Sequence, residues 1–278
     1  MRLSDRGKRT PVEPGKDATR PLADAAPPAA LQIRWQGWVA LALVLVAWEA
    51  FVRLADIPVL YLPGPTTVIA ALYDLFLHGG LWRDLLVTLW RIFGGFAIAS
   101  VTGVALGIWM GTSRHAEAIG DIFVAALYPL PKVTLIPLFI IWLGEGETFQ
   151  LTLSWLGAIF PIVVNTLLGV KECDKGLLLA ARDLGANERQ IKWRVILPSA
   201  VPHIFAGLRL GLGVSIILVV AAEMVTGRTG LGARLYLAGQ VLETGQVFAV
   251  LLLLAILGIA VSKAQDAIGR MLGNWRSG

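Results

Sequence analysis

Six apolar stretches, each close to the length needed to cross a membrane, constrain this chain more than any other feature of its sequence. A hydrocarbon core about 30 Å thick is crossed by about 20 helical residues. Such a segment has to be helical, because no water is present to satisfy unpaired backbone N–H and C=O groups. The chain is 56% hydrophobic and only 15% charged, whereas soluble domains carry about 25% charged residues. We predict an all-α membrane protein with six transmembrane helices, at about 36–54, 87–111, 119–143, 149–170, 200–225 and 246–265.

Two segments outside these stretches have a recognisable character. Residues 1–34 are polar and rich in proline, alanine and charge, which predicts a disordered basic tail. No small-residue cleavage site follows the first apolar stretch, so we expect residues 35–85 to begin with an uncleaved membrane anchor. After a turn at Pro63-Gly64-Pro65, one helical face is apolar, which predicts a short interfacial helix along the periplasmic surface of the membrane. The side chains on this face belong to Val68, Leu72, Leu75 and Phe76.

The distribution of lysine and arginine predicts the orientation, because cytoplasmic segments carry the excess of these residues. With the N-terminus in the cytoplasm, the tail holds seven of them, the 112–118 loop one, the 171–199 loop six and the C-terminal end three. The outer segments hold only Arg53, Arg83, Arg228 and Arg234. We therefore place the N-terminus and the charged segment at 172–198 on the cytoplasmic side.

The charged segment at 172–198 predicts two short helices joined by a glycine, and we call it the elbow. Asp174 is placed to cap the first helix, and Gly185 to end it in a left-handed conformation. Asn187, with Gln190 three residues later, predicts a capping box at the start of the second helix. Pro198 lacks a backbone N–H, which predicts that this helix ends before the fifth span begins.

One side of the elbow is made of small residues, Ala180, Ala181 and Gly185. Small side chains let the backbone of a partner approach closely, so this side is a candidate docking surface. The alternative interpretation is a solvated loop whose helices only pack beneath the membrane helices. The residues of the elbow by themselves do not distinguish a docking surface from a solvated loop.

The elbow also resembles the EAA loop of the permease subunits of bacterial ABC importers. That loop reads Glu-Ala-Ala, three residues, Gly, nine residues, Ile, one residue, Leu-Pro. The same spacing occurs here, with Leu179 in place of the glutamate and Val195 in place of the isoleucine. The resemblance covers nearly all of residues 60–275 and is closest to nitrate, sulfonate and taurine permeases. The segments that support it are LYLPGPTTV, YPLPKVTLIPLFIIWLGEGE, GLRLGLG and AAEMVTGRTGLG.

The resemblance implies a type I importer permease domain over 86–267 and a cytoplasmic tail over 268–278. It implies a cytoplasmic membrane location in a bacterium and a solute that is a small anion or organic oxyanion of the nitrate, sulfonate or taurine class. The implied partners are a second identical chain, two ATPase subunits and a periplasmic or lipid-anchored solute-binding protein. The elbow would fit into a groove of the ATPase through Ala180, Ala181, Gly185, Ala186, Ile196, Leu197 and Pro198.

Three charged residues in the spans are candidates for the solute pathway or its gate, because intramembrane charges are costly and usually functional. Lys132 follows a double-proline break, and it either meets an anionic solute, reaches the interface or pairs with a carboxylate. For Arg209 we favour a structural ion pair or a carbonyl partner. Glu223 either faces the gate or lies in the head-group layer. Arg91, close to the outer end of its span, is expected to extend toward the interface.

Two patterns shape the second and third spans. Gly103, Gly107 and Gly111 repeat every four residues and let another helix approach closely. That helix belongs either to a moving or dimeric seam or, as we favour, to the packing within one subunit. Pro129 and Pro131 interrupt the third span, and a broken helix at membrane depth is tolerated where it lines protein or a cavity.

The chain lacks the residue patterns that ATP binding, metal binding and catalysis require. No G-x-x-x-x-G-K-[ST] phosphate loop occurs, so ATP is expected on a partner subunit and no cofactor on this chain. The three histidines and the single Cys173 fit no metal spacing, and no catalytic constellation appears, so we expect neither an enzyme nor a metal site. The basic residues are scattered between spans, which favours lipid contact over nucleic-acid binding. An ion-gradient-driven transporter or channel is the alternative function; internal repeats would favour it, and none is found.

Overall fold

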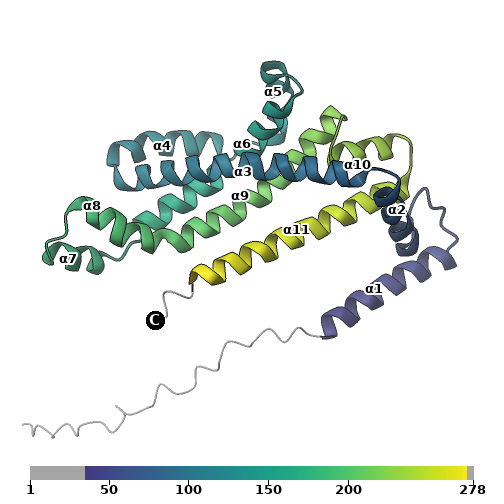
Figure 1. The fold of residues 1–278 in the computed structure, drawn as a ribbon, viewed down its shortest axis with the longest axis horizontal. Helices are drawn as coiled ribbons and strands as arrows, with labels where there is room; N and C mark the ends of the chain where they lie inside the picture. Colours follow the sequence, from purple (N-terminus) through teal and green to yellow (C-terminus); the bar gives the residue numbers. More distant parts are fainter. Residues whose placement is uncertain (1–34, 274–278) are drawn as a thin grey trace, which may run out of the picture. The chain divides into compact units, whose positions relative to one another are not determined.

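The computed structural model describes residues 35–273, and every regular element among them is a helix. The tail predicted at 1–34 lies outside the described residues. Five helices are long and apolar enough to cross a membrane, and one sharply bent pair makes up to six, which confirms the all-helical membrane fold (Figure 1). The helices are α1 (Trp35–Leu54), α2 (Pro65–Leu77), α3 (Leu81–Thr112), α4 (Arg114–Leu127), α5 (Ile136–Leu143), α6 (Glu147–Lys171), α7 (Lys175–Asp183), α8 (Glu188–Ile191), α9 (Leu197–Thr226), α10 (Leu231–Gln240) and α11 (Thr244–Gly273).

Helices α3, α6 and α9 pack together along most of their length. The stripe of Gly103, Gly107 and Gly111 on α3 faces α6, where a methyl group added at Gly107 or Gly111 would collide with Thr166 or Val170. Leaving out a side chain at every fourth position brings the two helix backbones together. The stripe therefore serves packing within the subunit, as favoured from the sequence.

The third span is broken as predicted. Helix α4 and the helical segment Lys132–Leu143, which starts with a 3-10 turn at Lys132–Leu135, meet at 86°. Pro129 and Pro131 cannot donate backbone hydrogen bonds, so the helix ends at Leu127. Figure 1 shows α5 projecting away from the direction of α3 and α4.

The second helix of the elbow and the fifth span form one helix, which differs from the expectation that Pro198 ends the elbow. The helix runs without a break from Glu188 to Thr226 over 39 residues. A π-helical turn at Lys192–Ile196 precedes the proline, and the N–H of Leu197 donates to the carbonyl of Lys192. This wider turn gives the proline ring room beside the preceding carbonyls, so the helix continues through a residue that usually interrupts it.

Helix α10 was not expected from the sequence. It follows Gly230, whose φ of +104° suits only glycine, and it packs on α9 and α11. Ten residues are too few for a span, and the neighbouring glycines predict a loop, so periodicity offered no signal. Helix α11 reaches Gly273, so the boundary predicted at 268 for the C-terminal tail falls inside a helix.

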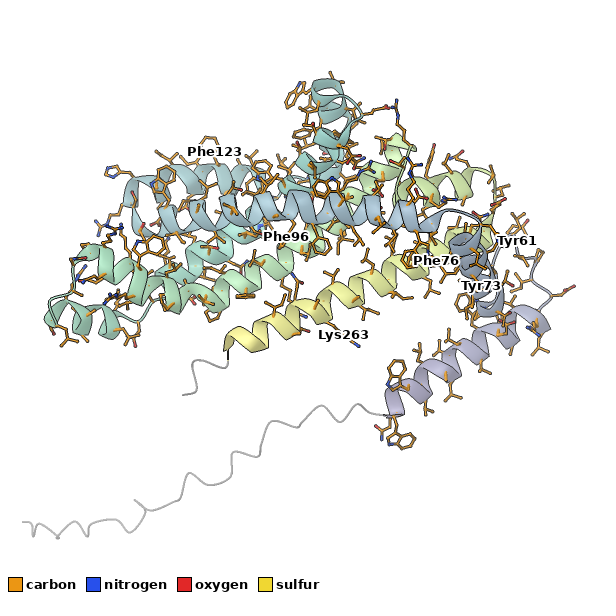
Figure 2. The ribbon with its side chains drawn as sticks, in the orientation of Figure 1. Tyr61, Tyr73, Phe76, Phe96, Phe123 and Lys263 are labelled. Carbon is orange, nitrogen blue, oxygen red and sulfur yellow. The ribbon has the colours of Figure 1, made fainter. Side chains whose placement is uncertain are left out.

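The short helix predicted after the first span is α2, and protein covers its apolar face. Val68 and Leu75 are buried in a cluster that also contains Leu231 of α10 and Val250 of α11. Tyr73, on another side of α2, is exposed (Figure 2). An exposed tyrosine suits the membrane–water interface, since its ring is apolar and its hydroxyl polar.

Candidate functional site

The first helix of the elbow, α7, begins at the predicted cap. The Oδ1 atom of Asp174 accepts a hydrogen bond from the backbone N–H of Gly176 at 2.7 Å. This bond satisfies one of the N–H groups that the first turn of a helix leaves free.

Helix α7 ends in a Schellman motif centred on Gly185. The N–H of Gly185 donates to the carbonyl of Arg182 at 2.8 Å, and the N–H of Ala186 donates to that of Ala181 at 3.0 Å. Gly185 has a φ of +81°, in the left-handed region, as predicted. No atom lies within 4 Å of the place where its β-carbon would be, so the backbone conformation alone requires glycine here.

The second helix of the elbow begins with the predicted capping box. Oδ1 of Asn187 accepts from the N–H of Gln190, and Oε1 of Gln190 accepts from the N–H of Asn187, both at 2.9 Å. Arg182 and Glu188 form an ion pair of 3.1 Å between the two short helices. The elbow is therefore a pair of capped helices joined by an ordered turn rather than an irregular loop.

The remaining candidate elbow residues, Ile196, Leu197 and Pro198, lie at the junction with α9 and are half-buried. The surface of α7, in contrast, carries apolar side chains that nothing in the subunit covers. Leu179 is 60% exposed and Leu184 is 88% exposed, and Ala180 beside them is exposed. Exposed leucines on a short helix outside the spans are typical of a protein-binding surface.

Glu223 and Arg91 are the inner part of a buried ionic cluster, so the expectation that Arg91 extends to the interface was wrong. Glu223 is fully buried and Arg91 is 5% exposed, and Nη1 of Arg91 lies 2.9 Å from Oε1 of Glu223. Arg91 also pairs with the partly exposed Glu147 at the start of α6. Arg91 thus points into the helix bundle rather than to the interface, and Glu223 is enclosed within the same subunit.

The Glu223 carboxylate has two further kinds of donor. The Thr88 hydroxyl donates to it at 2.9 and 3.0 Å, and the N–H of Gly232 donates at 2.9 Å. Gly232 belongs to the first turn of α10, so the carboxylate also lies at the positive end of that helix. The sequence analysis did not identify Thr88, Glu147 or Gly232; the signal available was that Arg91 and Glu223 are opposite charges within two spans.

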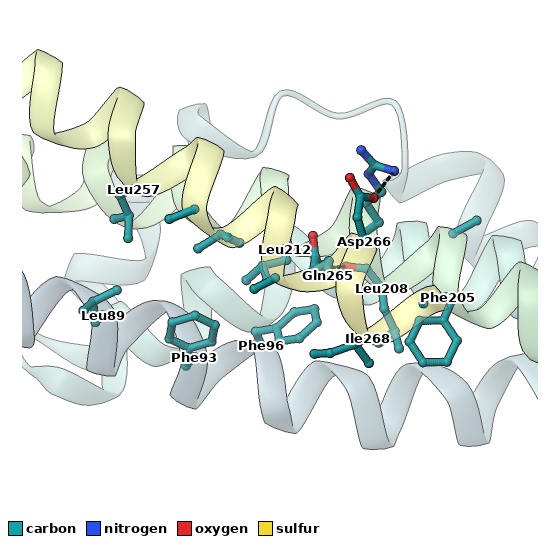
Figure 3. A pocket seen from close by; sticks show the side chains of 16 residues that line it. Leu89, Phe93, Phe96, Phe205, Leu208, Leu212, Leu257, Gln265, Asp266 and Ile268 are labelled. Carbon is teal, nitrogen blue, oxygen red and sulfur yellow. Dashed lines mark hydrogen bonds and ion pairs between the residues drawn. The ribbon is translucent and has the colours of Figure 1, made fainter. Parts of the chain in front are cut away.

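Arg209 forms the structural ion pair that the sequence analysis favoured. Its Nη1 atom lies 2.7 Å from Oδ1 of Asp266 on α11, and Nη2 lies 3.3 Å from the hydroxyl of Ser262. The pair borders a largely apolar cavity of about 890 Å³ between α3, α9 and α11, with Phe93 and Leu257 in its lining (Figure 3).

Lys132 lies at the break of the third span and has a different environment. Its ammonium donates to the carbonyl of Tyr128 at 2.9 Å and lies above the rings of Tyr128 and Phe160. Lys132, Arg209 and Glu223 are therefore held by different partners and do not form one site. Among residues 35–273, no group of three His, Cys, Asp or Glu side chains is arranged to hold a metal.

Comparison with known proteins agrees with this architecture. Residues 103–274 match the family described as binding-protein-dependent transport system inner membrane component. The chain is 35% identical over 240 residues to the taurine transport system permease protein TauC of Escherichia coli, covering 84% of this chain and 87% of that protein. It is 32% identical over 242 residues to the putative aliphatic sulfonates transport permease protein SsuC of Bacillus subtilis, covering 87% and 88%.

A solved structure of the MetNI methionine ABC transporter in an inward-facing conformation contains a similar chain. The TM-score is 0.55 at 26% sequence identity, and the match covers 69% of this chain and 94% of that one. The family match and the two permease relatives confirm the resemblance found in the sequence, and they describe a transport subunit rather than an enzyme. The chain belongs to the family of binding-protein-dependent transport system inner membrane components, the permease subunits of ABC importers.

Proposed function

We propose that this chain is the membrane-spanning subunit of an importer for small organic sulfonates, within the wider class of small anions and organic oxyanions. Two relatives support this solute class, since one is named for taurine and the other for aliphatic sulfonates. The proposed complex contains two copies of this chain, two ATPase subunits that bind the ATP, and a periplasmic or lipid-anchored binding protein. The excess of positive residues supports a cytoplasmic N-terminus and elbow.

The elbow is the observation that carries the proposal. Its capped helices, left-handed turn and exposed leucines offer a shaped surface for an ATPase subunit. Because α8, the π-helical turn and α9 are one helix, a force on the elbow moves the fifth span directly instead of bending a loop. We assign the docking contacts to Ala180, Ala181, Gly185 and Ala186, and the connection to the span to the segment 196–198.

This mechanism depends on the shape of the elbow more than on a carboxylate. Leu179 occupies the position where the family motif has glutamate, and its side chain, like that of Leu184, is exposed. A leucine in this position contributes apolar contact area to the docking surface but cannot form an ion pair.

Substitution of Gly185 tests the role of the elbow. Gly185→Asn serves as the control, because asparagine tolerates a positive φ. Gly185→Trp adds bulk at a position where a β-carbon would meet no atom of the subunit, and it also strains the left-handed turn, so both effects disturb the docking surface. In vesicles containing the assembled complex, Gly185→Asn should retain ATP-driven uptake, and Gly185→Trp should hydrolyse ATP while uptake falls to the level without ATP.

Full uptake by Gly185→Trp would contradict the docking role. The importer itself is tested by purifying the wild-type chain from membranes in detergent. Retention of an ATPase subunit supports the proposal. If no ATPase is ever retained and uptake follows an ion gradient, the ion-gradient-driven transporter is the correct function.

A further inference from the structure

The ammonium group of Lys132 lies at a defined depth in the helix bundle. Its Nζ atom is 5.2 Å from the centre of the Phe160 ring and 5.4 Å from that of Tyr128. Phe160 is one residue beyond the middle of α6, Glu147–Lys171, which is a membrane-spanning candidate. At 1.5 Å per residue, the ammonium is therefore level with a point about 16 to 20 Å from either end of α6.

A position beside the middle of α6 favours the interior over the interface as the destination of the Lys132 side chain. Lysine reaches head groups only from positions near the end of a span, because its stem has four carbons. Here the side chain folds back over two aromatic rings, and the Tyr128 carbonyl at the end of α4 accepts one of its three N–H donors. The ammonium is thus held beside the middle of α6, away from both ends of that helix.

The charge of Lys132 has no carboxylate partner in the part of the chain that the structure describes, since none of the ion pairs found there includes it. The other two cations within the predicted spans do have partners, Glu223 and Glu147 for Arg91 and Asp266 for Arg209. A lone cation at the bilayer centre is unfavourable and is usually retained for function.

We propose that Lys132 is the site where the anionic group of the transported solute binds midway across the membrane. This inference rests on the proposed function and adds the residue that meets the sulfonate group. Two N–H donors of Lys132 remain for sulfonate oxygens, and the rings of Tyr128 and Phe160 flank the ammonium. Transporters commonly bind solute near the bilayer midplane, where helices are discontinuous, as the third span is here.

A single ammonium group binds an anionic solute in a way that suits its passage through the transporter rather than its tight retention. A transport site has to bind strongly enough to admit the solute and weakly enough to release it. A compact ammonium accepts an anion from many directions, whereas an arginine fork holds it in one geometry. A single lysine near the middle of the pathway meets both requirements.

The first test uses Lys132→Met and the charge-preserving Lys132→Arg in vesicles containing permease, ATPase and binding protein. Radiolabelled taurine is the probe, and ATP hydrolysis stimulated by the binding protein is measured in the same vesicles. Lys132→Met should lower taurine uptake about tenfold or more, the value of one charge-assisted hydrogen bond, while stimulated ATP hydrolysis continues. Lys132→Arg should retain more uptake than Lys132→Met, because it keeps the positive charge, but less than the wild type, because its fork holds the anion in one geometry.

Unchanged uptake by Lys132→Met would overturn the inference. So would failure of Lys132→Met to assemble with the ATPase, because Lys132 would then pair with another subunit. Absence of ATP-driven taurine uptake by the wild-type complex is a separate result, which refutes the proposed function itself.

A second test restores the charge chemically. Cys173 is the only cysteine, so Lys132→Cys in a Cys173→Ala background carries one thiol. An aminoethyl thiosulfonate reagent should restore uptake, a sulfonatoethyl reagent should not, and taurine should slow both modifications. Lack of reaction at residue 132, or equal recovery with both reagents, would show that this position is not a cationic site on the solute pathway.

Discussion

At the scale of single residues, Glu223 shows how a carboxylate is kept inside a membrane helix bundle. It is fully buried, and Arg91, Thr88 and the first turn of α10 all donate hydrogen bonds to it. A buried ion pair adds little net stability, because desolvation offsets the attraction, but loss of one partner leaves the other uncompensated. Arg91 and Glu223 therefore tie α3, α9 and α10 together in one arrangement.

Arg91→Met should destabilise the protein strongly, by about 3 to 5 kcal/mol, because Glu223 then has to remain charged without a cation or take up a proton. Arg228→Met is the control: its pair with Glu145 is 2.8 Å long but largely exposed, and exposed pairs contribute at most about 1 kcal/mol. Thermal unfolding of both purified variants in detergent measures the difference. Similar midpoints for the two variants would show that the Arg91 contacts are not important for stability.

Lys132 and Arg209 illustrate why the position of a charge in the sequence does not define its role. Both are cations within predicted spans, but Asp266 compensates Arg209, whereas aromatic rings and a carbonyl hold Lys132. A cation whose charge is already balanced offers an incoming anion less attraction than one that is not. This difference, rather than charge alone, distinguishes the proposed solute site at Lys132 from the structural pair of Arg209 and Asp266.

At the scale of helices, close contact between α3 and α6 depends on missing side chains. A β-carbon added at Gly107 would lie 2.5 Å from the β-carbon of Thr166, whereas one added at Gly258 of α11 would meet nothing within 4 Å. Both glycines are helical, so alanine has the same advantage in helix propensity at each position, about 1 kcal/mol. Only the collision at the α3–α6 contact differs between the two sites.

Gly107→Ala should therefore lower the thermal unfolding midpoint, since overpacking typically costs about 1 to 3 kcal/mol and exceeds the gain in helix propensity. Gly258→Ala should leave the midpoint unchanged or raise it. Tryptophan fluorescence during heating in detergent follows both variants, aided by the 10 tryptophans of the chain. An unchanged midpoint for Gly107→Ala would mean that α3 and α6 can move apart without loss of stability.

At the scale of the whole molecule, the proposed importer requires copies and partners that one chain does not supply. Exposed leucines on α7 and the lone charge of Lys132 are both explained if ATPase subunits contact the elbow and solute passes the third span. The second helix of the elbow and the fifth span are also one continuous helix. A pair of such chains would respond symmetrically to closure of two ATPase subunits.

Native mass spectrometry of the complex purified with its ATPase should show two copies of the 29.9 kDa chain for every two ATPase subunits. This composition follows from a closed two-fold assembly, the commonest symmetry of soluble oligomers. A denatured sample gives the subunit masses as the reference. A complex with one copy of this chain and a different second permease would contradict the proposed pairing of identical chains.

Much of the fold could be predicted from the sequence, and the misses have identifiable causes. The broken third span, the caps at Asp174 and Asn187 and the left-handed Gly185 were predicted because each depends on a few neighbouring residues. Helix α10 was missed because its flanking glycines predict a loop. The prediction that Pro198 ends the second elbow helix was wrong because a π-helical turn accommodates the proline, and no residue pattern predicts such a turn.

The sequence by itself determined the membrane class, the spans and the local shape of the elbow. The membrane class and the spans follow from the length of the apolar runs. The breaks and turns follow from prolines, which lack a backbone N–H, and from a glycine that can adopt a positive φ, and both effects act within a few residues. Only the tertiary structure decided what each charge does. Arg91 and Glu223 are 132 residues apart along the chain, and their hydrogen bond exists because α3 and α9 present those faces to each other. Lys132 was a candidate for the solute pathway from the sequence, and the structure distinguishes it from Arg209 for the same reason, since the helices around it place two rings and a carbonyl, and no carboxylate of the described residues, beside its ammonium.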